Sequence, residues 1–121
     1  MVMVSRQPRK QRKAVYTAAL HTRRKFVSAH IAKELRTKLG TKRRSIAVRK
    51  GDRVKVLRGG FKGRSGKVTD VDLKKSWIFV EGCVRRKSGG RETMAPIRPS
   101  NVMIVEADFG DKCRKAVLER K

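Results

Sequence analysis

The sequence predicts a mainly β domain. We expect a small closed barrel of five short strands, preceded by a basic extension with one short helix and followed by one short C-terminal helix. Short apolar segments follow one another from residue 53 to residue 106, separated by turns rich in Gly, Pro, Ser and Asn. More than half of the net positive charge lies in the first third of the chain. A chain of 121 residues allows one domain of ordinary size rather than two.

Charge divides the chain into three regions. Residues 1–44 hold 14 basic residues and 1 acidic residue, residues 45–109 hold 15 and 7, and residues 110–121 hold 5 and 2. We therefore expect a basic nucleic-acid-binding extension over residues 1–44, the barrel over residues 45–109 and the C-terminal helix over residues 110–121.

The extension offers little that a core would bury. Residues 5–13 are almost entirely polar and basic, so we expect them to be disordered in the isolated chain. Residues 14–27 mix apolar side chains such as Tyr16 and Leu20 with basic ones, without a clear period. This pattern indicates an extended segment that lies on a partner.

The clearest helix pattern follows the extended segment. Ile31, Leu35 and Leu39 recur at four-residue spacing. Ser28 is a favourable N-cap and Gly40 a favourable residue to end the helix. We expect one helix over residues 29–39.

From residue 45 the pattern favours β structure. Val68 and Val71 break strict alternation, which indicates a bulge. Trp77 and Phe79 are expected in the core rather than against bases, and residues 85–91 are expected to form a basic loop. Asp111 can cap a final helix over residues 111–120. The expected strands are residues 53–58, 67–72, 77–81, 92–97 and 101–106.

The net charge of +24 restricts the classes of binding partner that the chain can have. A free protein with this charge repels itself, so a polyanion is expected to accompany it. Nucleic acid is the commonest such partner, because each neutralised phosphate releases a counterion. A membrane partner is disfavoured because apolar runs do not exceed four residues. The first residues lack the apolar segment of a secretory signal, so none is expected.

No group of residues predicts catalysis or metal binding. Cys83 and Cys113 lie 30 residues apart without a Cys-x-x-Cys pair, which favours free thiols in a reducing compartment. His21 and His30 have no neighbouring ligand cluster, so neither a metal nor a cofactor is expected. The sequence contains no phosphate-binding loop and no nucleophile arrangement. We therefore expect no enzyme.

The carboxylates among the basic residues have a simpler expected role. Asp52, Asp70 and Asp72 each stand close to Lys or Arg in the sequence. We expect them to form ion pairs rather than general acid–base pairs.

The most informative stretch is residues 48–68, a hairpin with a glycine-rich turn. Glycine permits positive φ and a close approach of the backbone to a ligand. Free backbone N–H groups and basic side chains at such a turn suit phosphate oxygens. On these residues alone, the alternative to a phosphate-binding turn is a tight turn on a solvated surface. Phe61 at the tip is either a base-stacking residue or a hydrophobic lid.

Residues 48–68 resemble a KOW motif, which occurs in certain ribosomal proteins and transcription elongation factors. Further blocks narrow the resemblance: SAHIAKELR at 28–36, VRKGD at 48–52, VEG at 80–82 and PSNV at 99–102. In this order they resemble the archaeal and eukaryotic branch of the large-subunit ribosomal protein L twenty-four family, numbered twenty-six in eukaryotes. The resemblance covers about residues 14–121. The basic loop at 85–90 departs from it by being short.

The resemblance implies an SH3-like barrel bound to the 5′ domain of large-subunit ribosomal RNA. It also implies an early role in subunit assembly, a place near the peptide exit tunnel on the cytoplasmic ribosome, and neighbouring ribosomal proteins as partners. No membrane and no homo-oligomer are expected. The residues expected to contact RNA are Arg9, Lys10, Arg12, Lys13, Arg23, Arg24, Lys25, Lys42, Arg43, Arg44, Arg58, Phe61, Lys62, Gly63, Arg64, Lys67, Arg85, Arg86 and Lys87.

Other function classes fit less well. A KOW-type transcription elongation or RNA-binding factor is the main alternative, but it would need a domain that contacts polymerase. Residues 1–47 are too short and too basic to form one. A membrane-surface protein would need a helix with a broad apolar face, and the predicted helix has a narrow one.

Overall fold

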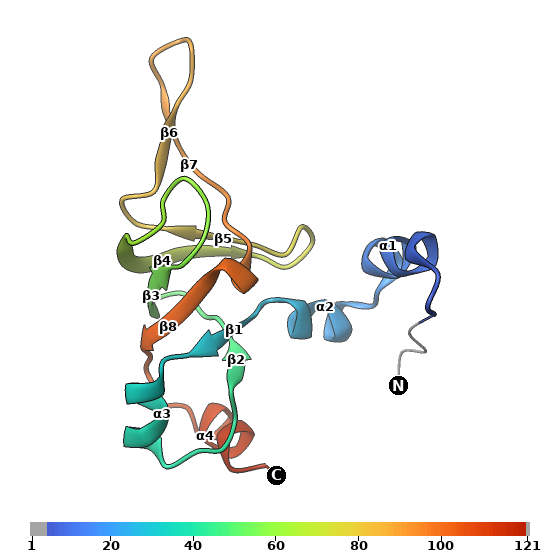
Figure 1. Ribbon diagram of the computed structural model, residues 1–121, viewed down its shortest axis with the longest axis vertical. Coiled ribbons are helices and arrows are strands. Elements are labelled where there is room, and N and C mark those ends of the chain that lie inside the picture. Colours follow the sequence, from blue (N-terminus) through green and yellow to red (C-terminus); the bar gives the residue numbers. More distant parts are fainter. Residues whose placement is uncertain (1–4, 121) are drawn as a thin grey trace.

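A central curved sheet carries two projections in the computed structural model, which describes residues 5–120 (Figure 1). One projection, the arm, is formed by residues 5–27 and extends to one side of the sheet. The other, the ribbon, is formed by residues 84–94 and rises above the sheet. The residues of both projections lie far from the core, so most of them are exposed to solvent.

The arm is helical, which corrects two predictions. Helix α1 spans Pro8–Thr17 and helix α2 spans Leu20–Phe26, where disorder and an extended segment were expected. Pro8 stands at the first helical position, where its fixed φ suits a helix start. The residues after it include Arg, Lys, Gln and Ala, which have high helix propensity. Neither helix contains a buried residue.

The predicted helix over residues 29–39 is only partly correct. Strand β1 (Ser28–Ile31) occupies its first turn, and helix α3 (Lys33–Leu39) begins after Ala32. Ser28 is therefore not the N-cap. Ala29 and Ile31 are buried in alternation with exposed His30, which is the two-residue period of a strand. The predicted end is confirmed, because Gly40 adopts a left-handed conformation with φ of 60° and its N–H bonds back into the last turn.

Six strands form the central sheet in the order β2-β1-β8-β3-β4-β5. Strand β1 pairs in parallel with β8, through His30 with Met103 and Ile31 with Ile104. The other pairings are antiparallel, and the predicted bulge is confirmed by a register shift between Val68 and Asp70. The remaining strands are β2 (Ser45–Ala47), β3 (Arg53–Val56), β4 (Ser65–Asp72), β5 (Trp77–Val80) and β8 (Val102–Glu106).

The mainly β character is confirmed, but the described strands follow an open order rather than a closed ring of five. Strand β8 uses one edge for β3 and the other for β1, so β2 and β5 lie at opposite ends of the sheet. A single bridge, Ile78 with Ile97, joins β5 to the segment that leads into β8. This segment contains a short 3-10 helix, Pro99–Asn101, at the predicted turn.

The core lies inside the curved sheet. Val54, Val56, Val68 and Ile78 are at most 2% exposed, which confirms the alternation seen in the sequence. Ile78 and Val80 supply the core from β5, whereas Trp77 and Phe79 lie half-buried on the other face. The prediction that both aromatic residues pack in the core is therefore wrong.

The expected basic loop at residues 85–91 and the fourth strand at residues 92–97 combine into the ribbon. Strand β6 (Val84–Arg86) pairs with β7 (Glu92–Met94), so only the tip is a loop. The ribbon extends away from the core despite its short length (Figure 1).

Helix α4 (Lys112–Glu119) confirms the predicted C-terminal helix. The Asp111 side chain caps it by accepting a hydrogen bond from the Cys113 N–H at 2.9 Å. Leu118 is buried against the core from this helix. Among the described residues, no helix has both the length and the apolar composition needed to cross a membrane.

Candidate nucleic-acid interface

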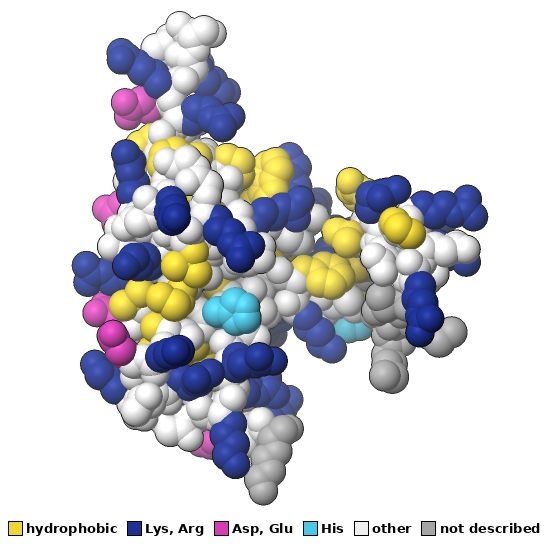
Figure 2. Space-filling model, viewed as in Figure 1, with side chains coloured by type: hydrophobic (Ala, Val, Ile, Leu, Met, Phe, Trp, Pro, Cys, Tyr) yellow, Lys and Arg dark blue, Asp and Glu magenta, His cyan; other side chains and the backbone are white. Residues whose placement is uncertain are grey.

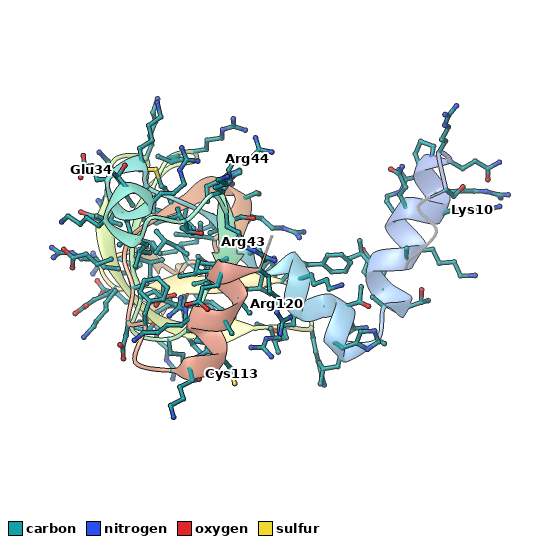
Figure 3. The ribbon with its side chains drawn as sticks, turned by 90° about the horizontal axis from the view of Figure 1, so that it is seen from below. Lys10, Glu34, Arg43, Arg44, Cys113 and Arg120 are labelled. Carbon is teal, nitrogen blue, oxygen red and sulfur yellow. The ribbon has the colours of Figure 1, made fainter. Side chains whose placement is uncertain are left out.

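The arm concentrates positive charge without any compensating acid. Residues 5–33 contain no Asp or Glu, and the first carboxylate is that of Glu34. Lys10 points away from the rest of the molecule at the far end of the arm (Figure 3). A helical cation stripe that stands free of the core is suited to lie along phosphates. The exposed candidates in the arm are Arg9, Lys10, Arg12, Lys13, Arg24 and Lys25.

Arg23 has a different position from the other arm candidates. Its guanidinium donates to the Tyr16 carbonyl at 2.6 Å and to the Ala18 carbonyl at 2.9 Å. These carbonyls lie at the C-terminal end of α1, which has no further turn to satisfy them. Arg23 therefore joins α1 to α2, and two of its donor groups are already used in this structural role.

A second basic cluster lies beside the end of α4. Figure 3 labels Arg43, Arg44 and Arg120 in the region where the loop after α3 meets this helix. The Thr41 hydroxyl donates to the Leu118 carbonyl at 2.9 Å, and Arg43 Nε donates to the Arg120 carbonyl at 3.3 Å. These bonds hold the loop against the helix, while Lys42 and Arg44 remain exposed.

The KOW turn, residues 57–64, is a rigid loop between β3 and β4. The Gly63 N–H donates to the Val56 carbonyl at 2.8 Å, and the Val56 N–H donates to the Arg64 carbonyl at 2.8 Å. Gly59 and Gly63 have φ values of 99° and 86°, which non-glycine residues rarely adopt. Within residues 5–120, the side chains of Arg58, Lys62 and Lys67 have no hydrogen-bonding or ion-pairing partner, so they are available to a ligand.

Phe61 and Arg64 are engaged with each other. The Arg64 guanidinium lies 5.3 Å from the centre of the Phe61 ring, and its Nη1 donates to the Gly82 carbonyl at 2.9 Å. Phe61 is half-buried and packs against the core. The geometry favours the lid over the stacking alternative for Phe61, and it gives Arg64 a role in fixing the turn.

The ribbon carries the fourth group of candidates. Arg85, Arg86 and Lys87 are exposed on β6 and at the tip, with Arg91 close by in the sequence. In the register of the two strands, Arg85 lies opposite Thr93 and Arg86 lies opposite Glu92. Basic side chains cover the ribbon, the front of the sheet and the arm, whereas most visible acidic ones follow one edge (Figure 2).

A hollow with mixed charge lies beside β3, β4 and the end of β8. Its lining includes two basic residues, Arg53 and Lys67, and three acidic ones: Glu81, Glu106 and Asp108. Arg53 and Glu106 approach to 3.5 Å. The carboxylates make this hollow poorly suited to a polyanion, although Lys67, one of the candidates, also borders it.

The carboxylates predicted to form ion pairs largely do so. Asp52 pairs with Arg114 and Asp70 pairs with Lys50, as expected, whereas Asp72 accepts from the N–H groups of Lys74 and Lys75 in a turn. Hydrogen bonds from Lys50 and from the Val71 N–H lower the pKa of Asp70.

The cap of α4 and the free thiols are further local features. Arg49 and the Cys113 N–H lower the pKa of Asp111 in the same way as Lys50 acts on Asp70. Both cysteines are free; Cys83 is buried and Cys113 is exposed. Burial raises the pKa of the Cys83 thiol, and the nearby charge of Arg64 partly opposes that shift.

Two features of this surface were not predicted from the sequence. Arg120 joins the cluster of the 41–44 loop, and only the contact between two segments 77 residues apart reveals it. Tyr16 is 79% exposed, which leaves it open to a partner, but it lies on a helix rather than on the expected extended segment. The missing signal for Tyr16 was the helical character of α1.

Two comparisons with known proteins agree on the family. Residues 5–121 match a family described as the ribosomal proteins L26 of eukaryotes and their L24-type archaeal counterparts. The chain is 49% identical over 115 residues to a large ribosomal subunit protein, uL24, of Pyrobaculum islandicum, which covers 95% of this chain and 92% of that protein. The KOW turn, the basic arm and the sequence blocks described above are thus those of a ribosomal protein, and the chain belongs to the archaeal and eukaryotic family of large-subunit ribosomal protein L24/L26.

Proposed function

We propose that this chain, a non-enzymatic structural constituent of the large ribosomal subunit, binds ribosomal RNA through four basic surfaces. These are the arm, the 41–44 loop, the KOW turn with Lys67, and the ribbon. One observation carries the proposal. The ion pairs among the described residues involve Arg49, Lys50, Arg53 and Arg114, and none of these belongs to the candidate set. Apart from Arg23, Arg43 and Arg64, which donate to backbone carbonyls, the candidate cations are left for an external polyanion.

The mode of binding follows from the kind of residues available. Unpaired Lys and Arg around a rigid turn neutralise phosphates and recognise the shape of RNA rather than its sequence. The arm and the ribbon project from the sheet, so RNA can surround them on several sides. Binding of this kind is strongly salt-dependent.

We further propose that the RNA is the 5′ domain of the large-subunit ribosomal RNA, near the peptide exit tunnel, and that binding occurs early in assembly. The family resemblance of the motifs supports the location. The projecting arm supports the timing, because a helix without a protein core of its own is most easily enclosed while the surrounding RNA is still open.

The division of the chain and the barrel remain proposals of the same kind. We infer that β3, β4, β5 and β8 correspond to an SH3-like barrel core over residues 45–109, with a basic extension before it and a helix after it. Their common core at Val54, Val68, Ile78 and Ile104 supports this inference. The family membership does not favour the alternative of a transcription elongation factor.

The deciding experiment is sedimentation of a native cell extract on a sucrose gradient in moderate Mg²⁺, with detection of this chain in each fraction. We expect the chain to sediment with the large subunit and to remain there through a salt wash. Crosslinking in the same fractions should then place it on the 5′ domain. Migration with RNA polymerase, or at the top of the gradient, would overturn the proposal.

A further inference from the structure

The aromatic residues of this chain differ sharply in what covers them. Three of the six have a cation over the ring: Phe61 with Arg64 at 5.3 Å, Trp77 with Lys75 at 5.1 Å and Phe109 with Arg114 at 5.1 Å. Phe79 is half-buried on β5. Phe26 exposes 40% of its surface and Tyr16 exposes 79%. Tyr16 is therefore the aromatic side chain most open to a ligand in the described part of the chain.

The backbone of Tyr16 is held by a hydrogen bond although its ring is exposed. Tyr16 lies in the last turn of α1, and its carbonyl accepts a hydrogen bond from Arg23 Nη2 at 2.6 Å. Arg23 Nε also donates to the Ala18 carbonyl at 2.9 Å. These bonds hold the elbow between α1 and α2, so Tyr16 is presented at a defined place. Where α1 is folded, as when RNA encloses the arm, the two bonds from Arg23 keep the Tyr16 backbone at this place.

The side chains around Tyr16 indicate the chemistry of its partner. Residues three, four and seven positions before it lie on the same face of a helix, and these are Lys13, Arg12 and Arg9. All three are exposed, and no carboxylate occurs in residues 5–33. An aromatic ring at the end of a cationic stripe matches a strand whose phosphates meet the cations and whose base meets the ring.

We propose that Tyr16 is the base-stacking residue of the arm and receives an unpaired nucleobase splayed out of the RNA. This inference rests on the proposed RNA binding and adds the class of RNA feature that the arm requires: a bulge, internal loop or single strand rather than a continuous duplex. Leu20, the first residue of α2, is 65% exposed and is a second uncovered apolar side chain in the arm. The high positive charge of the arm favours RNA over a neighbouring protein as the occupant.

Tyr16 is the single tyrosine of the chain, which gives the experiment a unique reporter. The full chain with labelled tyrosine is titrated with a transcript of the 5′ domain of the ribosomal RNA and, separately, with a perfect RNA duplex of matched charge. Proton NMR of the ring is recorded with each RNA, and affinity is measured for the natural chain and for Tyr16→Phe and Tyr16→Leu. Leucine favours helix at least as well as tyrosine, so loss of α1 does not explain a defect.

Stacking predicts an upfield ring-current shift of the Tyr16 signals with the structured transcript. It also predicts that Tyr16→Leu weakens binding to that transcript about 5- to 100-fold while Tyr16→Phe does not. On the duplex the three chains should bind alike. If the natural chain binds the transcript and Tyr16→Leu binds it equally well, stacking is overturned, RNA binding stands, and Tyr16 is left to a protein neighbour. If the natural chain does not bind the transcript, the proposed RNA binding itself fails and stacking fails with it.

Discussion

The Asp52 carboxylate accepts both terminal N–H groups of the Arg114 guanidinium, at 2.8 and 2.6 Å, in the interior of the protein. The two side chains are 1% and 4% exposed. Further bonds support the pair: the Arg49 N–H donates to Asp52 at 2.9 Å, and Arg114 donates to the Asp108 carbonyl at 2.9 Å. The pair thereby connects helix α4 to the segment that enters β3.

Removing one partner of this pair should destabilise the fold strongly, because the other charge stays buried without compensation. We expect Arg114→Met and Asp52→Asn each to lower the free energy of unfolding by about 3–5 kcal/mol. The double variant should lose less than the sum of the two losses. Urea denaturation of the isolated chain measures this. Arg53→Met is the control, since its exposed pair with Glu106 should contribute no more than about 1 kcal/mol. Equal losses for Arg114→Met and Arg53→Met would contradict the expectation.

Gly66 allows a close approach of two backbone segments. A Cβ built on Gly66 would lie 2.5 Å from the Glu81 carbonyl oxygen, which belongs to the backbone and cannot rotate away. Gly66→Ala should therefore destabilise the fold by about 1–3 kcal/mol. Gly60→Ala is the matched control, because a Cβ there meets nothing within 4 Å and the backbone φ is not positive. Thermal unfolding of both variants tests the difference, and equal midpoints would refute it.

The KOW turn should contribute to RNA affinity through charge alone. The double variant Lys62→Glu with Arg64→Glu would not test charge alone. Arg64 donates to the Gly82 carbonyl, so replacing Arg64 alters the turn itself as well as its charge. Arg58→Gln with Lys62→Gln is cleaner. We expect this variant to weaken RNA binding at moderate salt and to reduce the salt slope of log K by about 1 to 2 without unfolding the chain. Lys112→Gln with Lys115→Gln, on α4, is the control with equal charge loss. An unchanged slope would remove the KOW turn from the interface.

Backbone hydrogen exchange of the isolated chain should distinguish a slowly exchanging sheet from a rapidly exchanging arm. The amides of Val54, Val56, Val68 and Ile78 should exchange only on global unfolding, because these residues are buried in the sheet. The amides of α1 should exchange rapidly, since a ten-residue helix without buried residues is marginal by itself. Strong protection in α1 without RNA would contradict this expectation.

The two thiols should react differently with an alkylating reagent. Burial raises the pKa of Cys83, so little of the reactive thiolate forms near neutral pH, and Cys113 is exposed on α4. Mass spectrometry after mild alkylation should find the label on Cys113 and not on Cys83. The denatured chain should be labelled at both. Label on Cys83 in the folded chain would show that the core opens there.

Sequence patterns predicted the sheet much better than its surroundings. Val54, Val56, Val68 and Ile78 follow burial rules that hold in any half-buried strand, and Gly40 and Asp111 mark helix ends by local chemistry. The arm was missed because helix propensity there is not accompanied by an apolar stripe. Strand β1 was missed because Ala29 and Ile31 alternate over only four residues, within a longer helical spacing.

The candidate site shows a similar division. Charge and glycine content were sufficient to mark the KOW turn and the basic clusters. They did not distinguish cations free for RNA from those with structural partners: Arg23 and Arg64 each donate to backbone carbonyls that the sequence does not specify. Nor did they indicate that Arg120 would meet Arg43, because that contact depends on the packing of α4.

The parallel pairing of β1 with β8 has a consequence for biosynthesis. His30 and Ile31 find their partners Met103 and Ile104 only after nearly the whole chain has been made. Pairing between distant segments is slow and requires both to be free of the ribosome that synthesises them. The cationic arm is thus translated well before the sheet can close. During that interval the newborn chain carries an exposed cationic arm without a finished sheet.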